Sequence, residues 1–225
     1  MLFVWYNILK ICAKRRLYMN IVNNSLTIVL IADWNKLYTQ PDWVANNIFC
    51  QPEMEIGIET QGSEFIVSYK CGSIVINPSQ DKVIITAADI RKETIGFLID
   101  CANNYIKKAI IPYFSAYGFN IDFVETESTL LSEIFDSISD SQAFIGLGYE
   151  IENSQIDRRI VKSNKVMNVE FTQESNLSKI HFNEHYEETE TQRIVLNCES
   201  IENFIGCAKE IAIELGFEFD GEEDE

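Results

Sequence analysis

The chain contains two stretches that follow the same order of residue types, and this repetition restricts its fold more than any single motif. Residues 81–90 lead into a segment with helical spacing that includes residues 97–102. Residues 192–201 lead in the same way into a helical segment that includes residues 203–208. A repeat of this length predicts two structural units of similar design.

The match extends outward from these stretches in the same order along the chain. The matched pairs are residues 25–33 with 119–125, residues 47–49 with 133–135, residues 56–59 with 147–150, and residues 74–77 with 180–183. The separation between paired segments changes along the chain, as expected when loops accept insertions. Each half is therefore predicted to contain the same series of strands and helices.

The first half has the patterns of one buried strand, a short helix and four further strands. Residues 26–32 form a nearly continuous aliphatic run, which is typical of a central strand. Pro41 stands at the first position of a predicted short helix. Turn residues then separate predicted strands at residues 53–60, 65–71, 73–77 and 82–87.

Each half ends in a predicted long helix with one apolar side. The helices span about residues 90–111 and 201–215, with Asp89 and Ser200 at the capping positions. Gly118 and Gly216 are predicted to end them. The apolar positions are Ile95, Leu98, Ile99, Ala102, Tyr105, Ile106 and Ala109 in the first helix, and Ile201, Phe204, Ile205, Ala208, Ile211, Ala212 and Leu215 in the second.

These patterns predict an α+β fold of two β-α-β-β-β-β-α pseudo-repeats, which form a curved antiparallel sheet with two long helices on one face. The order of elements over residues 25–219 resembles the TATA-box-binding-protein fold in topology, although no sequence motif of that family is present. The resemblance implies one curved sheet with the long helices on its convex back, and it implies no activity. The predicted division is residues 19–117 for the first pseudo-repeat, 118–220 for the second and 221–225 for an acidic tail, with both repeats in one compact unit.

Residues 1–18 differ from the rest of the chain and are predicted to lie outside the folded core. An apolar run is followed by the basic residues 14–16, the reverse of the order in a secretory signal. The run is too short to span a bilayer, although it could lie on a membrane surface. We interpret the segment as a non-core N-terminal arm or an upstream extension before a start at Met19, and we predict no membrane span.

The charge of the chain restricts its partners. The 225 residues carry a formal net charge of −17 at pH 7, which opposes binding to phosphate backbones and disfavours direct contact with nucleic acid. The same charge favours either a basic protein partner or simple solubility. The six cysteines form no Cys-x-x-Cys pair, which indicates a reducing, cytoplasmic setting. We expect no cofactor.

Both histidines of the chain fall in one five-residue motif, His181-Phe-Asn-Glu-His185. The pattern His-x-x-Glu-His is that of zinc proteases in which two imidazoles on one helical face bind the metal and the glutamate is the base. Here apolar and polar residues alternate as in a strand, which would hold the histidines too far apart for one metal and turn Glu184 away. The carboxylates of Glu184, Glu187, Glu188 and Glu190 could instead hold magnesium, with Asp157 or others, or form a solvated loop.

Two functions remain open from the sequence. The first is a non-enzymatic, acidic protein-interaction module, such as an inhibitor or antitoxin-like binder of a basic protein, in which the curved sheet or an acidic edge makes the contact. Its candidate partner-binding residues are Glu187, Glu188, Glu190, Glu222, Glu223 and Asp224. The alternative is a metal-dependent hydrolase in which His181 and His185 bind the metal and Glu184 is the catalytic residue.

Overall fold

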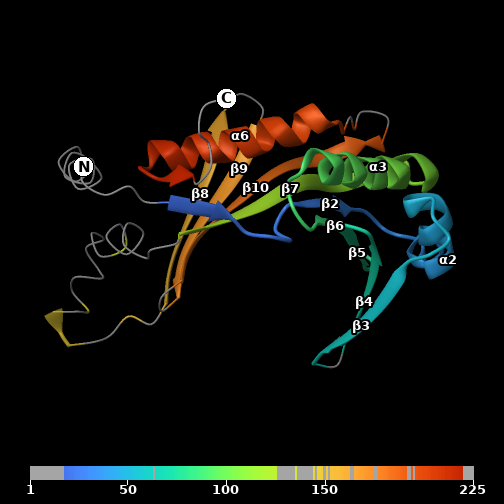
Figure 1. Cartoon of the computed structure of the whole chain (residues 1–225), viewed down its shortest axis with the longest axis horizontal. Coiled ribbons are helices and arrows are strands. Elements are labelled where there is room, and N and C mark those ends of the chain that lie inside the picture. The colour runs from blue at the N-terminus through green and yellow to red at the C-terminus, as the bar shows by residue number, and fades with distance from the viewer. Residues whose placement is uncertain are drawn as a thin grey trace.

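The protein is an α+β structure with one large, mainly antiparallel sheet of 11 strands (Figure 1). The computed structural model describes residues 18–62, 64–125, 135, 144, 146–148, 151, 153–162, 165–174, 177–191, 194 and 196–219. The α+β class and the large antiparallel sheet predicted from the sequence are confirmed.

The strands of the first half lie side by side in nearly the order in which they follow along the chain. They are β3 (Glu55–Gln61), β4 (Glu64–Cys71), β5 (Ile74–Pro78) and β6 (Lys82–Ala87), and β6 pairs with β2 (Thr27–Ile31). Left-handed backbone at Gly62 and Gly72, with φ of 62° and 57°, allows the tight turns on either side of β4. The predicted strands agree with these bounds to within two residues.

A short helical segment connects β2 to β3. The 3-10 helix η1 (Lys36–Thr39) precedes α2 (Pro41–Val44), which begins at Pro41 as predicted, and the π-helix η2 (Ala45–Phe49) continues it. Cys50 ends the segment in a left-handed conformation with φ of 54°. The amide of Asn104 donates a hydrogen bond of 2.9 Å to the carbonyl oxygen of Ile48, which fastens this segment to the following long helix.

Strand β7 (Tyr113–Glu125) joins the two halves of the sheet. One of its edges pairs with β2 and then with β1 (Tyr18–Ile21), and the other pairs with β10 (Leu177–Glu190). β9 (Lys165–Glu174) and β8 (Asn153–Lys162) follow β10 outward, and β11 (Glu218–Phe219) pairs in parallel with β1. The order across the sheet is β3-β4-β5-β6-β2-β7-β10-β9-β8.

One matched segment of the sequence is not a strand. The repeat predicts that residues 192–197 are the counterpart of β6, but Ile194, Leu196 and Asn197 lie outside any strand. β10 occupies the place beside β7 instead. The physical reason is that α6 begins at Cys198 with Asn197 as its N-cap, so the chain turns into the helix at this point.

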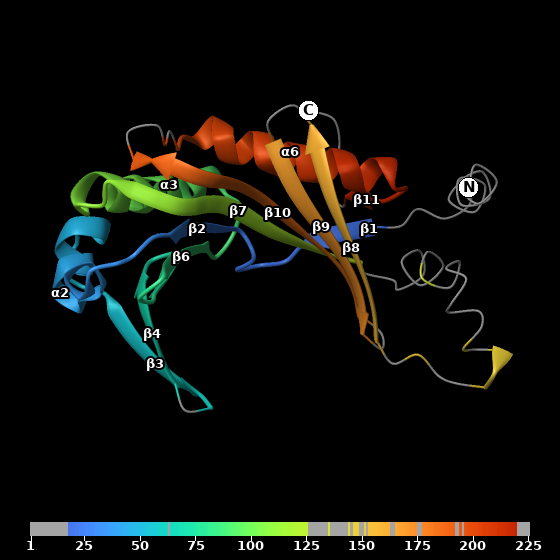
Figure 2. The same ribbon diagram turned by 180° about the vertical axis from the view of Figure 1, so that it is seen from behind.

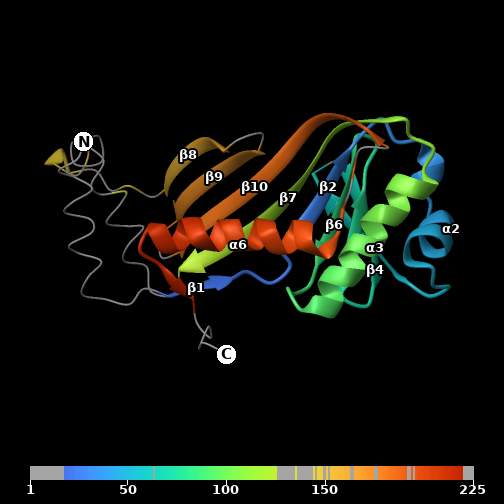
Figure 3. The same cartoon turned by 90° about the horizontal axis from the view of Figure 1, so that it is seen from above.

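The helices α3 (Lys92–Lys108) and α6 (Cys198–Glu214) have 17 residues each and lie on the same side of the sheet (Figure 3). All seven apolar positions predicted for α3 are buried. In α6, five of the seven predicted positions are buried, whereas Ile211 and Leu215 near its end are partly exposed. The apolar stripes therefore identify the helix sides that face the sheet.

Neither helix begins at its predicted cap. Arg91 is the N-cap of α3, and Asp89 accepts hydrogen bonds from the backbone N–H and the Nε of Arg91 at 3.0 and 2.9 Å. The side chain of Asn197 caps α6 by accepting from the backbone N–H of Ser200 at 2.8 Å, so Ser200 lies inside the first turn. The side chain of Asn197 thereby pairs with a backbone N–H of the first helical turn, as is typical of an asparagine at the N-cap.

The two glycines predicted to end the helices have different roles. Gly216 follows α6 with φ of 101°, as predicted for a helix end. Gly118 lies within β7, because α3 already ends at Lys108. A Cβ atom at position 118 would lie 2.6 Å from the carbonyl oxygen of Glu184, so glycine permits the close approach of β7 and β10.

Strand β1 crosses the predicted N-terminal boundary. Tyr18, which the sequence assigns to the arm, pairs with Glu218, and the side chain of Met19 is fully buried. Residues 1–17 and the acidic tail at 221–225 lie outside the described residues. No helix in the described part of the chain is long and apolar enough to cross a membrane.

The sheet is strongly curved, and the helices lie on its convex side (Figure 1, Figure 2). The β3–β4 hairpin hangs from one end of this arch, and the far ends of β8, β9 and β10 hang from the other. Aromatic rings connect the two layers, as where Phe204 of α6 lies 5.7 Å from Phe119 of β7 between ring centroids. The apolar core lies between the helices and the convex face, and no described helix covers the concave face.

Candidate functional site

Strand β10 divides its side chains between two environments. Ile180, Phe182 and Glu184 are buried on the helix side. The alternate residues lie on the concave side, next to the residues that pair with them on β7 and β9. We call this concave surface the open face; it carries the side chains of Thr27, Asn120, Asp122, Asn168, Glu170, Lys179, His181, Asn183, His185 and Glu187.

A row of hydrogen-bonded polar side chains crosses four strands of the open face. Asn120 of β7 donates to the hydroxyl of Thr27 on β2 at 2.9 Å. Asn183 of β10 donates to the side-chain oxygen of Asn120 at 2.7 Å, and Asn168 of β9 donates to that of Asn183 at 3.0 Å. Because each amide orients the next, the row presents donors and acceptors in a fixed arrangement.

His181 forms a short polar contact beside this row. Its Nδ1 lies 2.6 Å from a carboxylate oxygen of Asp122, and the ammonium of Lys179 lies 3.5 Å from the other oxygen. Burial raises the pKa of Asp122, but the hydrogen bond from His181 and the charges of His181 and Lys179 outweigh it and lower that pKa from its ordinary value. The pair holds the imidazole in one orientation, as proton transfer and ligand recognition both require.

His185 is held by different partners. Its Nδ1 lies 3.4 Å from the amide nitrogen of Asn168, and its Nε2 lies 3.2 Å from a carboxylate oxygen of Glu187. Arg159 of β8 approaches the same carboxylate at 4.0 Å. His185 pairs across the sheet with Gly118, and the missing side chain of Gly118 lets the two backbones approach closely, since a Cβ there would lie 3.1 Å from the Cβ of His185.

Glu184 lies on the opposite side of the sheet from both histidines. Its side chain is 1% exposed, accepts a hydrogen bond from the hydroxyl of Tyr186, and lies 3.3 Å from the ammonium of Lys165. Its second oxygen, Oε2, is buried and has no hydrogen-bond partner within the described residues. Burial, followed by the bond to Glu184 and its charge, raises the pKa of Tyr186.

The motif His-x-x-Glu-His is thus divided by the strand. His181 and His185 contact two separate carboxylates, those of Asp122 and Glu187, and Glu184 points into the core. Over the part of the chain that the structure describes, no three histidine, cysteine or acidic side chains are placed to hold a metal ion. Of the carboxylates considered for magnesium, Glu184 and Glu187 lie on opposite faces of the sheet and so cannot bind the same ion.

The predicted acidic partner-binding residues are only partly described. Glu187 and Glu190 are exposed on β10. Glu188 belongs to the same strand, whereas Glu222, Glu223 and Asp224 lie outside the described residues. Asn120, Asn183 and Asn168 of the open face are further candidate site residues, and no motif in the sequence identifies them. Their signal is the alternation of polar residues on β7, β9 and β10, but the sequence does not give the register that brings them together.

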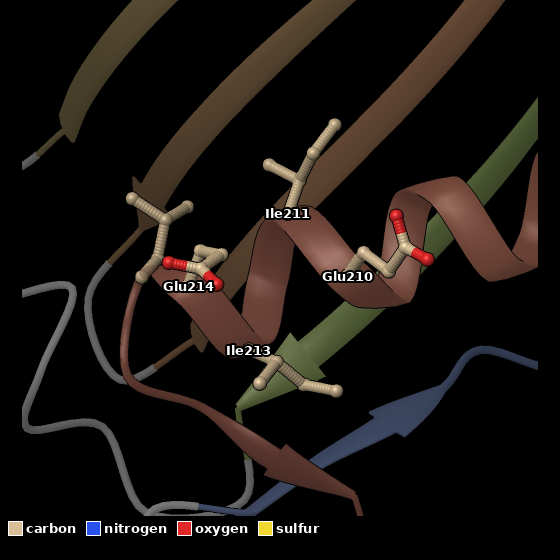
Figure 4. A pocket seen from close by; sticks show the side chains of 5 residues that line it. Glu210, Ile211, Ile213 and Glu214 are labelled. Atoms are coloured by element: carbon tan, nitrogen blue, oxygen red, sulfur yellow. The ribbon is translucent and has the colours of Figure 1, made fainter.

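A separate hollow of about 530 Å³ lies beside the last turns of α6 (Figure 4). It is lined by Glu210, Ile211, Ile213, Glu214 and Leu215, all from the end of α6 and its C-cap. Ile211 and Ile213 point away from each other in the figure, and Ile213 is 51% exposed. Because polar groups from different elements do not converge on it, the hollow has less of the character of a binding site than the open face.

The polar row and the two histidine–carboxylate contacts make the open face the candidate site among the described residues. Comparison of the chain with protein-family models, with curated protein sequences and with solved structures gives no significant match.

Proposed function

We propose that the chain is a non-enzymatic protein-interaction module whose open face binds a protein partner. The proposal is carried by one observation, the hydrogen-bonded row from Thr27 to Asn168 on a concave sheet face that no described helix covers. Antiparallel sheets often leave one face in water. A concave face with fixed donors and acceptors is, in addition, suited to recognising the polar groups of a partner without a large ordering cost.

The partner is proposed to be a basic protein, which the chain binds as an inhibitor or antitoxin-like factor. A net charge of −17 attracts a basic surface over long range and speeds its approach. Glu187 lies on the open face, and Glu190 follows it at the end of β10. We propose that Glu188 and the acidic residues 222–224 extend this contact.

The hydrolase alternative receives no support from the site. A metal-dependent hydrolase needs two imidazoles and a base around one metal-bound water. Here Glu184 is on the helix side, while His181 and His185 lie on the open face with separate carboxylate partners.

The proposal also includes the internal repeat of the chain and its location in the cell. We propose that the two halves are pseudo-repeats, supported by the strand order outward from the centre: β2 is followed by β6, β5, β4 and β3, and β7 by β10, β9 and β8. We also propose a cytoplasmic location, supported by the free state of the cysteines that the structure describes, at positions 50, 71, 101, 198 and 207.

Capture of partners from extracts of the source cell tests the function, with Glu187→Lys on the open face and Glu202→Lys on α6 as a matched pair. Both residues are exposed, and both changes reverse one charge. A partner retained by wild type and Glu202→Lys but lost by Glu187→Lys supports the proposal. Equal retention by both variants contradicts it.

The captured partner then provides a kinetic test of the charge argument. The association rate should fall steeply as salt rises from low to physiological concentration, because salt screens long-range attraction. The dissociation rate should change little. An association rate that is independent of salt would contradict steering by charge.

A further inference from the structure

The sheet ends at β3, whose outer edge has no paired strand within the described part of the chain. β3 pairs with β4 through seven residue pairs, from Glu55 with Lys70 to Gln61 with Glu64. The hairpin projects from the end of the sheet, away from the helices (Figure 1). An unpaired edge presents a row of backbone donors and acceptors, and folded proteins usually protect such an edge.

One side of this hairpin is apolar and exposed. Ile56 and Ile58 of β3 are 52% and 66% exposed, and Phe65 at the start of β4 is 74% exposed. The three residues lie on the same side, because Ile56 pairs with Tyr69, Ile58 with Val67, and Thr60 with Phe65. Contiguous exposed apolar side chains beside an unpaired edge are typical of a contact surface.

The other side of β3 is acidic. It carries Glu55 and Glu59, separated by Gly57, and β3 itself contains no lysine or arginine. Lys70 of β4 approaches Glu55 at 3.6 Å, and both side chains are more than half exposed. A second copy of this strand would bring further glutamates and no basic residue to the edge, so it would offer no charge complementarity.

The opposite end of the sheet has a different edge. On β8, Arg158 interrupts the row formed by Ile156 and Ile160, and Arg159 and Lys162 add further positive charge. Basic residues spread along both sides of a strand protect its edge from pairing with another chain. β3 has no such protection on its apolar side.

We infer that the outer edge of β3 accepts an added strand from the partner, in which apolar residues alternate with lysine or arginine. The inference rests on the proposed function, since it identifies the segment by which a basic protein would be held. The apolar residues of the added strand would cover Ile56 and Ile58, and its basic residues would face Glu55 and Glu59. Main-chain hydrogen bonds to the edge of β3 would provide the remaining contact.

The test uses the full-length protein and two peptides with blocked termini. The first is Lys-Val-Lys-Val-Lys-Val-Lys, and the second, Lys-Lys-Lys-Val-Val-Val-Lys, has the same composition and charge without the alternation. We expect the alternating peptide to bind at least tenfold more tightly in calorimetry. It should slow amide hydrogen exchange in residues 55–61 and leave residues 153–162 unchanged. Equal affinity of the two peptides, or protection confined to β8 or the open face, would overturn the inference.

A matched pair of variants locates the contact. Ile58 on β3 and Val161 on β8 have nearly the same exposure, 66% and 64%, so a lysine at either position is tolerated to a similar degree. Ile58→Lys should weaken binding of the alternating peptide at least tenfold, and Val161→Lys should change it less than twofold. An equal effect of the two variants overturns the inference.

The same variants separate this inference from the proposed function. If the partner captured from extracts is lost by Glu187→Lys but retained by Ile58→Lys, the function stands and the added strand does not. If the peptide binds the edge of β3 as expected but open-face variants keep the partner, the inference stands and the role of the open face fails.

Discussion

The two faces of strand β10 differ in what they contribute to the molecule. Its helix-side residues Ile180, Phe182 and Glu184 are buried in the core. Its open-face residues His181 and Asn183 are partly exposed and form hydrogen bonds with residues of the neighbouring strands. The difference predicts that the helix-side residues contribute more to the stability of the fold than the open-face residues do. Substitutions on the two faces should therefore have different consequences.

The largest effect is expected from Phe182→Ala on the helix side. Phe182 is fully buried, with its ring centroid 5.2 Å from that of Phe123, so the change leaves a cavity in the core. Removal of such a ring costs about 3–5 kcal/mol. Its neighbour Asn183→Ala, on the open face, should cost less than about 1.5 kcal/mol. Denaturant unfolding of both variants measures the contrast, and equal losses would remove the distinction between the faces.

Gly118→Ala tests how closely the backbones of β7 and β10 approach each other. The added Cβ would lie 2.6 Å from the carbonyl oxygen of Glu184, which cannot rotate away, and overpacking of this kind costs about 1–3 kcal/mol. Gly96→Ala in α3 is the control, because nothing lies within 4 Å of its Cβ position. That control should be neutral or stabilise the protein by up to about 1 kcal/mol. A neutral result at Gly118 would show that β7 and β10 are less closely packed.

The buried carboxylate offers a test of the helix side that does not depend on cavities. Lys165→Met removes the cation near Glu184, and a buried carboxylate without its ion pair should cost about 1–3 kcal/mol. Adding Glu184→Met should recover most of this loss, because the charge is no longer buried. A double-mutant cycle in thermal or denaturant unfolding gives the coupling. A double variant less stable than Lys165→Met alone would contradict this account.

The smallest effect is expected from Asp122→Asn on the open face, and it should depend on pH. Because the pKa of Asp122 is lowered in the folded protein, its charged form contributes stability above the ordinary carboxyl value of about 3.9. That contribution is lost as the pH falls through the folded value. The variant should be less stable by about 1 kcal/mol at pH 7, with a difference that shrinks below about pH 4. A difference that grows toward acid pH would reverse the assignment.

Much of the secondary structure could be predicted because its signals are local. The predicted apolar positions from Ile95 to Ala109 repeat with the helical period, and all of them are buried along α3 and at its C-cap. The strand from Lys82 to Ala87 is recovered with its exact bounds because alternation and turn residues enclose it. Helix caps were predicted less well, since Asp89 and Ser200 compete with Arg91 and Asn197 for the same few positions.

The candidate site was only partly visible in the sequence. The His181 to His185 motif directed attention to β10, and its alternation predicted that Glu184 would turn away from the histidines. Asp122, the partner of His181, lies 59 positions away in the chain, and no local sequence pattern links the two residues. Asn120 and Asn168 could not be predicted for the same reason, because each joins the polar row only through its hydrogen bond with Asn183.

The sequence by itself determined the α+β class, the strands of the first half and the side of each helix that faces the core. These follow from periods of 3.6 and 2 residues, which are properties of the local backbone. Only the tertiary structure decided that β10 lies beside β7, and that the polar row crosses four strands. Strand neighbours and register depend on competition among distant segments for the same hydrogen-bonding edge, and a local pattern contains no record of that competition.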